Sequence, residues 1–424
     1  MIRALYTFLL VIALPFLLPS LYKHKLGKPS VGTRWKEHFG LTPSLNNPEN
    51  KPVIWVHAVS VGEVIAASPL IKKIHQAQPN AKILVTTTTP TGAKQAENLK
   101  EYAEHRYMPL DFTFAVKAFL KVVRPKQLII VETELWPNTL VTVSKKHIPI
   151  TVVNARLSDK SFRGYSKVKP LFNLLSPSLS KVICQHKDDA RRFENLGVPQ
   201  SKIFVSGSIK FDISISSEQS IKGKQLRCEL DSFRPIWIAA STHQGEDEKI
   251  LAAHSQVLQH VPNALLILVP RHPERFNDVM VKCCELFTTV RRTSYSTVSA
   301  STQVYLGDTM GEMLTLIGAS DVCFMGGSLL GNKVGGHNLL EPAALAKPTL
   351  TGPSYFNFSD ITKQLVASNS CQIINSESEL AEKIIELFHS TDLRDEQGQA
   401  ALSVVERNRG ALKNTIQHIF GEAR

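Results

Sequence analysis

The sequence lacks the short motifs that mark several large classes of protein. It contains no G-x-x-x-x-G-K-[ST] loop and no G-x-G-x-x-G turn after a strand, so neither a P-loop nor a dinucleotide-binding fold is indicated. Asp-x-Asp pairs and His/Cys ligand spacings are also absent, and we therefore expect no metal and no cofactor. No two cysteines form a C-x-x-C pair, which favours a reduced compartment without disulfides. The six cysteines are Cys184, Cys228, Cys283, Cys284, Cys323 and Cys371.

Acidic residues are too few to balance the basic ones. The chain has 49 Lys and Arg against 37 Asp and Glu, which gives a formal net charge of +12. Such an excess favours an anionic partner, either nucleic acid or a membrane surface. The aromatic residues are not interleaved with basic clusters, and no RNA-binding signature occurs. We therefore expect an anionic membrane surface as a partner, and no nucleic acid.

The first residues of the chain support a membrane location. Residues 4–21 carry no charge and are barely long enough to cross a bilayer. Positive charge directly after them predicts that the rest of the chain stays cytoplasmic. We expect an uncleaved anchor over residues 1–22; a cleaved signal peptide is the alternative, and Pro15 and Pro19 also allow a shallow interfacial helix. The basic residues that follow are Lys23, Lys25, Lys28 and Arg34.

After this segment, short apolar strands alternate with amphipathic segments in two successive series. Val/Ile/Leu-rich strands separated by helices are typical of parallel sheets buried on both faces. The sequence therefore predicts two α/β domains, over 50–208 and 235–390. Residues 209–234 are polar and weakly patterned, so an interdomain linker is expected there, and 391–424 are helical in pattern. The predicted strands are 53–58, 82–89, 128–132, 150–155, 181–185 and 203–207, then 235–242, 264–270, 304–308, 322–328 and 348–352.

Polar and glycine-rich residues follow these strands with unusual regularity. In parallel sheets ligands bind outside the carboxyl ends of the strands. If the two domains present these edges to each other, a cleft lies between them. The sequence therefore predicts a central cleft. The residues concerned are 57–63, 86–89, Glu132, Glu134, Asn154 and Arg156 in the first domain, and 241–243, Arg271, His272, 307–313 and 325–342 in the second.

The stretch 325–342 is the most informative of these. Four of its glycines, Gly326, Gly327, Gly335 and Gly336, allow the backbone to approach a ligand closely, and "HNLLEPAALA" is expected to begin a helix. The first N–H groups of a helix favour an anion. Glu341, one turn after Asn338, would accept hydrogen bonds from ribose hydroxyls. The alternative is that the glycines only form turns and Glu341 is an ordinary acid of a first helical turn.

Six ordered motifs carry a resemblance to a known family. They are "HAVSVGE" (57–63), "ETELWPN" (132–138), "GSIKFD" (207–212), "VPRHPER" (269–275), "GDTMGEM" (307–313) and "GGHNLLEP" (335–342). Together they resemble bacterial 3-deoxy-D-manno-octulosonate (Kdo) transferases over nearly the whole chain. The resemblance implies the two-domain GT-B architecture, with two Rossmann-like domains. It also implies that Kdo moves from CMP-Kdo to the lipid A precursor, lipid IVA, in lipopolysaccharide synthesis at the inner membrane.

The resemblance also assigns roles to individual residues. Glu63 would be the general base that takes the proton of the acceptor hydroxyl, and attack opposite to CMP would invert the anomeric centre. Glu132 and Lys210 would assist the transition state. Without the resemblance, Glu63 would be interpreted as an acid at a helix N-terminus. The donor CMP would be held by Arg271, His272, Gly311, Glu312, Met313, Asn338, Leu339, Leu340 and Glu341.

Two other functions are compatible with the residues alone. One is a different sugar-nucleotide enzyme on the same architecture, such as an epimerase or another lipid glycosyltransferase. The second is a membrane-tethered protein that binds a nucleotide without catalysis. No motif indicates how many Kdo residues are added, and none indicates an oligomeric state.

Overall fold

The computed structural model describes residues 2–22 and 29–421 and divides the chain into two compact units. Unit 1 comprises residues 1–212 together with 409–424, and unit 2 comprises 213–408. Each unit is described by itself below. Lys23, Lys25 and Lys28, three of the basic residues expected beside a membrane, lie outside the described residues.

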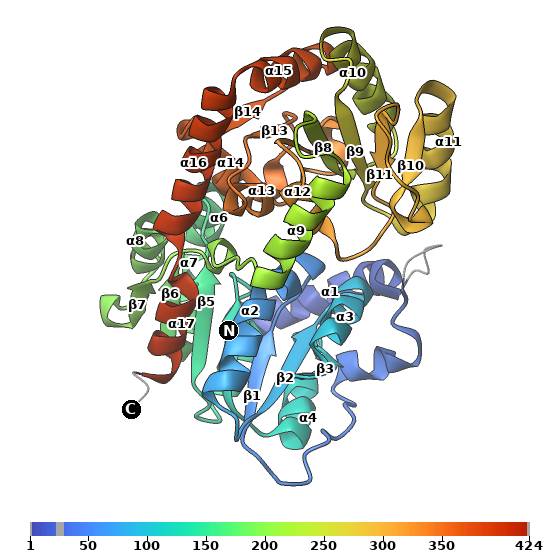
Figure 1. Cartoon of the computed structure of the whole chain (residues 1–424). Coiled ribbons are helices and arrows are strands. Elements are labelled where there is room, and N and C mark those ends of the chain that lie inside the picture. The colour runs from blue at the N-terminus through green and yellow to red at the C-terminus, as the bar shows by residue number, and fades with distance from the viewer. Residues whose placement is uncertain (1, 23–28, 422–424) are drawn as a thin grey trace. The chain divides into compact units, whose positions relative to one another are not determined.

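Unit 1 contains a seven-stranded sheet in which all paired strands are parallel (Figure 1). Its strand order is β3-β2-β1-β4-β5-β6-β7. The chain therefore extends the sheet from β1 toward one edge and then returns to β4 on the other side of β1. Ligands of such sheets bind beside this reversal. The strands are Val53–His57 (β1), Lys82–Thr87 (β2), Glu104–Tyr107 (β3), Pro125–Val131 (β4), Ile150–Ala155 (β5), Lys181–Cys184 (β6) and Ile203–Val205 (β7).

Helices bury both faces of this sheet, because successive strand residues point to opposite sides. Trp55 faces a core formed with α4, α5, α7 and α8, whereas Ile54 and Val56 face a second core formed with α2 and α17. The C-terminal helix α17 thus packs against the sheet that the N-terminal half of the chain forms. The helices are Ile2–Tyr22 (α1), Val61–Ala77 (α2), Pro90–Ala96 (α3), Thr113–Val123 (α4), Pro137–Ser144 (α5), Asp159–Lys167 (α6), Lys169–Leu175 (α7), Lys187–Asn195 (α8) and Ala411–Phe420 (α17).

Unit 2 repeats this construction with the order β10-β11-β9-β8-β12-β13-β14, again with parallel pairing. The chain reverses between β8 and β12. Its strands are Ile236–Thr242 (β8), Leu265–Pro270 (β9), Thr289–Arg291 (β10), Val304–Leu306 (β11), Val322–Met325 (β12), Thr349–Thr351 (β13) and Cys371–Ile373 (β14). Its helices are Ser217–Glu229 (α9), Asp247–His260 (α10), Phe276–Leu286 (α11), Met313–Gly318 (α12), Leu340–Ala344 (α13), Ser359–Ala367 (α14), Glu377–His389 (α15) and Thr391–Asn408 (α16).

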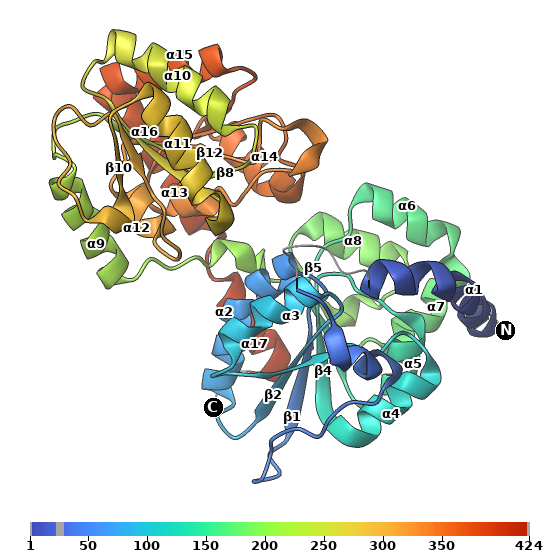
Figure 2. The same ribbon diagram turned by 90° about the vertical axis from the view of Figure 1, so that its right-hand side faces the viewer.

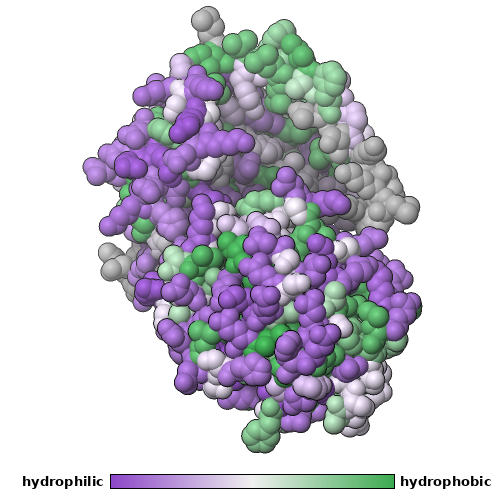
Figure 3. Space-filling model, turned by 90° about the horizontal axis from the view of Figure 1, so that it is seen from above, coloured by the Kyte–Doolittle hydropathy of each residue, from purple (hydrophilic) through white to green (hydrophobic). Residues whose placement is uncertain are grey.

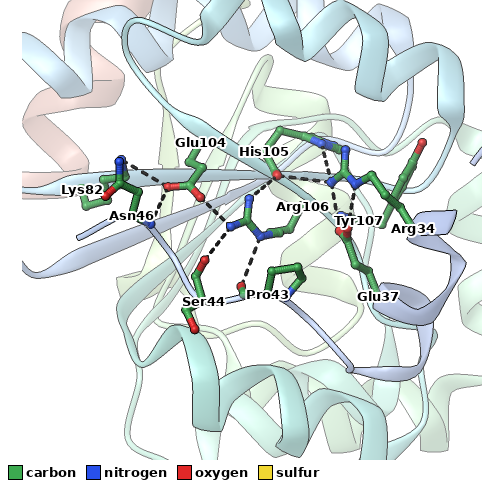
Figure 4. A network of polar contacts seen from close by, with 10 residues as sticks. All are labelled: Arg34, Glu37, Pro43, Ser44, Asn46, Lys82, Glu104, His105, Arg106 and Tyr107. Atoms are coloured by element: carbon green, nitrogen blue, oxygen red, sulfur yellow. Dashed lines mark hydrogen bonds and ion pairs between the residues drawn. The ribbon is translucent and has the colours of Figure 1, made fainter. Parts of the chain in front are cut away.

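The edge strand β3 has the polar sequence "EHRY", and a polar network explains it (Figure 4). Buried Glu37 accepts hydrogen bonds from Arg34 at 2.6 Å and from the backbone N–H of Tyr107 at 2.7 Å. Arg106 donates to the carbonyl of Ser44 at 2.8 Å. These bonds attach residues 34–46 to β3, so the strand is held by polar contacts as well as by its pairing with β2.

Two segments differ from the interpretation of the sequence. Half of the expected linker 209–234 is helix α9, which packs on α12 within unit 2, where Gly223 contacts Gly318. The C-terminal stretch consists of two helices rather than one. Gly410 separates them with a φ of 95°, a conformation that glycine adopts without strain, and α17 returns to unit 1.

Residues Ile2–Tyr22 of the expected anchor form helix α1, which lies beside α5 and α7 (Figure 2). Within the part of the chain that the structure describes, no helix meets the length and apolarity required to cross a membrane.

Candidate active site

Glu63 and Glu132 lie on the two sides of the chain reversal in unit 1. Glu63 follows β1 and Glu132 follows β4, and these strands are neighbours in the sheet. Both side chains therefore lie near the carboxyl edge of the same strand pair, where parallel sheets bind ligands. The negative charge of Glu132 also contributes to the environment of Glu63. The structure thus brings together two of the three residues expected to be catalytic.

Glu63 is the third residue of α2, whose N-cap is Ser60. One carboxylate oxygen accepts a hydrogen bond from the Val59 N–H at 2.8 Å, and the other accepts from the Ser60 hydroxyl at 2.9 Å. This arrangement is related to the capping box, in which an acid at the third helical position bonds back to the N-cap. Each oxygen has a second lone pair, so the carboxylate keeps capacity to accept a proton.

The surroundings of Glu63 oppose its negative charge. The residue is 9% exposed, and this burial raises its pKa from 4.5 to about 7. This value includes smaller contributions from its neighbours. The bonds from Val59 and Ser60 lower the pKa, and the nearby carboxylates Glu134 and Glu132 raise it. A general base works best when its pKa lies near the working pH. Glu63 therefore has the protonation behaviour that such a base needs.

Lys210 completes the group. Its ammonium lies 3.0 Å from an oxygen of Glu132, although 78 residues separate the two in the chain. Glu132 has a φ of 62°, a left-handed conformation that is rare outside glycine and common at functional sites. The three residues assigned from the resemblance thus form one cluster in unit 1, and Lys210 is its cation.

Asn154 holds the Lys210 segment in place. This residue is fully buried at the end of β5, has a φ of 52°, and accepts a hydrogen bond from the Ile209 N–H at 3.2 Å. The sequence identified Asn154 as a polar residue at a strand end but gave it no role. Because Ile209 directly precedes Lys210, this hydrogen bond indicates that Asn154 orients the segment.

In unit 2, a residue that the sequence interpretation missed organises the corresponding edge. Glu246 is fully buried and accepts backbone hydrogen bonds from His243 after β8, and from Gly327, Ser328 and Leu329 after β12. It therefore fastens together the two loops that flank the chain reversal. A Cβ at Gly326 would lie 2.9 Å from Glu246, which explains the glycine there. Glu246 lies only four residues after the end of β8, a signal that was available in the sequence.

The expected donor residues gather at the same edge. Arg271 directly follows β9, and its charge acts on Glu341, His337 and His243, so it faces all three. Burial raises the pKa of Glu341, and Arg271 opposes this shift. His272 is exposed beside Arg271, and its ring contacts that of His243 edge-on.

The turn 311–313 also has a partner that the sequence did not indicate. Arg292 donates to both carboxylate oxygens of Glu312, at 2.9 and 3.2 Å, and this pair lowers the pKa of Glu312. Gly311 has a φ of 83° and an open environment, and Met313 begins α12. The turn is thus anchored through Glu312, while Gly311 leaves its backbone accessible.

The segment 338–341 presents backbone rather than apolar side chains. Leu339 and Leu340 are 1% and 0% exposed, so their side chains belong to the core of unit 2. The Asn338 side chain accepts a hydrogen bond at 3.1 Å from the N–H of Leu340, the first residue of α13. This helix has five residues, fewer than the sequence suggested. Asn338 and Glu341 are therefore the side chains of this segment that remain for a ligand.

Across residues 2–22 and 29–421, the structure has no group of three or more His, Cys, Asp or Glu side chains that could hold a metal ion. The cations of the two clusters are instead side chains of the protein, Lys210 in unit 1 and Arg271 in unit 2.

The sequence of the chain is similar to that of one known family. Residues 33–213 match the family described as 3-deoxy-D-manno-octulosonic-acid transferase. The chain is 40% identical to the 3-deoxy-D-manno-octulosonic acid transferase of Haemophilus influenzae, over 98% of this chain and 97% of that protein. Identity at this level over both full lengths places the two sequences in one family.

Solved structures show the same fold. The UDP-GlcNAc 2-epimerase of Neisseria meningitidis matches with a TM-score of 0.58 at 13% identity, over 87% of this chain and 99% of that chain. A glycosyltransferase of Rickettsia africae matches with a TM-score of 0.54 at 15% identity, over 88% of this chain and all of that chain. The two parallel sheets therefore have the architecture of GT-B-type enzymes.

Proposed function

This chain belongs to the Kdo transferase family and is a glycosyltransferase, and we propose that it moves Kdo from CMP-Kdo to lipid IVA in lipopolysaccharide synthesis. The observation that carries the proposal is the cluster of unit 1, in which Glu63, with its pKa raised to about 7, lies near the Glu132–Lys210 pair. The family supports Kdo as the sugar. The CMP donor and the lipid acceptor are expected from the resemblance of the six motifs.

The reaction needs a base because a sugar hydroxyl is a poor nucleophile at neutral pH. Glu63 takes the proton of the acceptor hydroxyl as its oxygen attacks the anomeric carbon of Kdo. Attack from the side opposite to CMP breaks the bond to the phosphate and inverts the anomeric centre. One carboxylate is sufficient, because no covalent intermediate forms between sugar and enzyme.

Charge is rearranged on both substrates during this step. Positive charge develops on the sugar and negative charge on the departing phosphate. Lys210 stabilises negative charge, and Glu132 holds the ammonium of Lys210 in place through their 3.0 Å contact. Arg271 and the backbone at Gly311 are proposed to bind CMP in unit 2, with Asn338 and Glu341. No metal is assigned to the reaction.

The donor and the acceptor are tested in one experiment. Purified protein is incubated with lipid IVA and either CMP-Kdo or a UDP-sugar, and the lipid is analysed by mass spectrometry. We expect a mass increase of one or more Kdo residues with CMP-Kdo only. Modification with the UDP-sugar only, or turnover of a UDP-sugar without lipid, would indicate another sugar-nucleotide enzyme.

We further propose that the protein acts at the cytoplasmic side of the inner membrane, attached through α1. Polar contacts fix α1 to unit 1: Asn138 donates to the Thr7 hydroxyl at 2.9 Å, and buried Asp111 bonds to Tyr6. The opposite side of α1 exposes apolar residues at spacings of three or four, which lie on one face of a helix. These residues are Ile2, Leu5, Phe8, Leu9, Ile12 and Phe16.

Charge and hydropathy support this location. Helix α6, which contacts α7 as α1 does, exposes Lys160, Arg163 and Lys167, and each basic residue near an anionic surface contributes about 1 kcal/mol. On the face shown in Figure 3, hydrophilic side chains predominate, and a larger group of hydrophobic ones lies at the top of the view. A helix fixed to the domain with an apolar row outward is suited to lie in the membrane interface.

Substitution of the apolar row tests this location. Phe8→Asp with Ile12→Asp replaces two side chains that are 60% and 52% exposed, so the fold is retained. We expect binding to vesicles containing anionic lipid to weaken at least about tenfold, because burial of each apolar side chain contributes about 1.5–3 kcal/mol. Phe233→Asp, at a 95% exposed position of unit 2, is the matched control and should bind normally. Equal binding of both variants would contradict the proposal.

A further inference from the structure

Three histidines of unit 2 lie close together at the carboxyl edge of its sheet, where the residues expected to bind the sugar-nucleotide donor also lie. His243 follows β8, His272 follows β9, and His337 lies in the glycine-rich segment before α13. The Nε2 atoms of His243 and His337 are 2.8 Å apart, and the two rings are stacked with centroids 5.1 Å apart and planes 10° apart. Gly327 permits this approach, because a Cβ there would lie 3.0 Å from the His337 ring. The resemblance assigns no role to His243 or His337.

Hydrogen-bond chemistry restricts the protonation of this pair. Two nitrogens 2.8 Å apart share one proton, so one Nε2 donates and the other accepts. In the neutral pair, the donating ring carries a bare Nδ1 and the accepting ring carries an Nδ1–H. The neutral pair therefore offers one acceptor and one donor at its Nδ1 atoms. One added proton converts the acceptor into a donor, and both Nδ1 atoms are then N–H donors.

Without a bound ligand, the surroundings of His243 and His337 keep both rings neutral. Burial lowers the pKa of His243 to about 4 and that of His337 to about 3. Nearby positive charges contribute to both values. The charges of His272, Arg275 and Arg271 lower the pKa of His243. Those of His243, Arg271 and His272 lower the pKa of His337. Arg275 is paired with Asp247, and Arg271 faces Glu341. The Glu246 carboxylate accepts the backbone N–H of His243 and is occupied by four such bonds.

We propose that the hydrogen-bonded pair of His243 and His337 is a proton-coupled anion receptor, which takes up a proton from solvent when the phosphate of the sugar-nucleotide donor binds. The inference rests on the proposed function, because it assumes that the donor phosphate binds at Arg271. A bound phosphate neutralises the arginines that oppose protonation, and it accepts hydrogen bonds but donates none when fully ionised. Both effects favour the state with two outward N–H donors. The site thus acquires an additional positive charge together with its ligand.

Calorimetric titration with CMP counts the protons. The full-length protein is titrated near pH 7 in two buffers of different ionisation enthalpy, and the difference in binding enthalpy gives the number of protons taken up. The double variant His243→Gln, His337→Gln removes both rings and keeps polar side chains. His260→Gln, at an exposed position in the last turn of α10, is the matched control. Comparison with the double variant cancels protons exchanged by the phosphate of CMP itself.

The parent and His260→Gln should take up about half to one proton more per CMP than the double variant. The parent alone supplies a second readout: its affinity for CMP should fall with rising pH, by up to about tenfold per pH unit. Equal proton uptake in parent and double variant would overturn the inference, as would an affinity of the parent that does not change between pH 6.5 and 8.5. Failure of the parent to bind CMP would overturn the proposed donor as well, so the two failures are distinguishable.

Discussion

Glu63 has to be ionised before it accepts a proton, and the fold resists that ionisation. The carboxylate caps α2 through Val59 and Ser60, and burial together with Glu132 and Glu134 favours its neutral form. The interpretations as a helix-terminal acid and as a base are therefore compatible. A residue that serves only as a cap has no need of a pKa near 7, since a charge at this position is favourable to a helix.

This conflict predicts a pH-dependent difference in stability between the parent and Glu63→Gln. A folded-state pKa above the ordinary 4.5 means that the parent is fully stable below that pH and loses stability as the pH rises through about 7. One pKa unit equals about 1.4 kcal/mol, so the rise in the pKa of Glu63 from 4.5 to about 7 corresponds to about 3 kcal/mol in the free energy of unfolding. Glutamine never ionises, so the variant should be as stable as the parent at pH 4.5 and more stable at pH 8. Thermal melts at the two pH values measure this.

A constant stability difference over that range would contradict the raised pKa of Glu63. Glu194→Gln, in an exposed position of α8 in the same unit, is a suitable control. It should show the same pH dependence as the parent, because its side chain is exposed to solvent in the folded protein as well.

Single residues also show where the sequence was insufficient. The positions of Glu63, Glu132 and Arg271 after strands could be predicted, because the hydrophobic strands that precede them are evident, and that of Glu341 in the first turn of a helix was predicted as well. The contact between Lys210 and Glu132 required the resemblance, since nothing local to either residue indicates a partner 78 positions away. The roles of Glu246 and Arg292 were missed because their partners come from other strands and loops.

At the scale of elements, the edges of the sheets were the least predictable part. The strands missed in the sequence are β3, β10 and β14, and each lies at an edge of its sheet. An edge strand pairs on one side only, so it can be short and polar. β3 has four residues held by the network around Arg34 and Glu37, and β10 has three half-buried residues. The inner strands are buried on both faces and therefore form apolar runs that the sequence reveals.

The connection between β8 and β12 depends on one carboxylate, which predicts a large effect of Glu246→Gln. The amide nitrogen of glutamine would face backbone N–H groups that now donate to Glu246. We expect a loss of about 2–4 kcal/mol in the free energy of unfolding, together with weaker binding of CMP. Denaturant unfolding measures the first effect and calorimetry the second.

Glu248→Gln is the matched control for this substitution. Glu248 lies two residues further on, is 53% exposed and pairs with Lys282 on the surface. Surface ion pairs contribute at most about 1 kcal/mol, so this variant should be nearly as stable as the parent. If Glu246→Gln were as mild, the two loops would not depend on the carboxylate.

At the scale of the whole molecule, the chain is two α/β units, to which the proposed function assigns different tasks. Two domains and their approximate limits could be predicted from the two series of strands. The return of α17 to unit 1 could not, because it depends on a tertiary contact: Asp212 accepts hydrogen bonds from the N–H groups of Gly410 and Leu412. The central cleft expected from the sequence remains a prediction, as do the inversion and the lipid acceptor.

The separation of tasks makes Glu63→Gln the most direct test of the central claim, that unit 1 supplies the base and unit 2 binds the donor. The measurement is Kdo transfer to lipid IVA and CMP affinity at pH 8, where the parent carboxylate is ionised, beside a melt that verifies folding. We predict that turnover falls on the order of 10²–10⁴, since a general base contributes that much. CMP affinity should stay within about twofold of the parent, because the donor residues lie in unit 2. A folded Glu63→Gln variant with near-normal turnover would contradict the account.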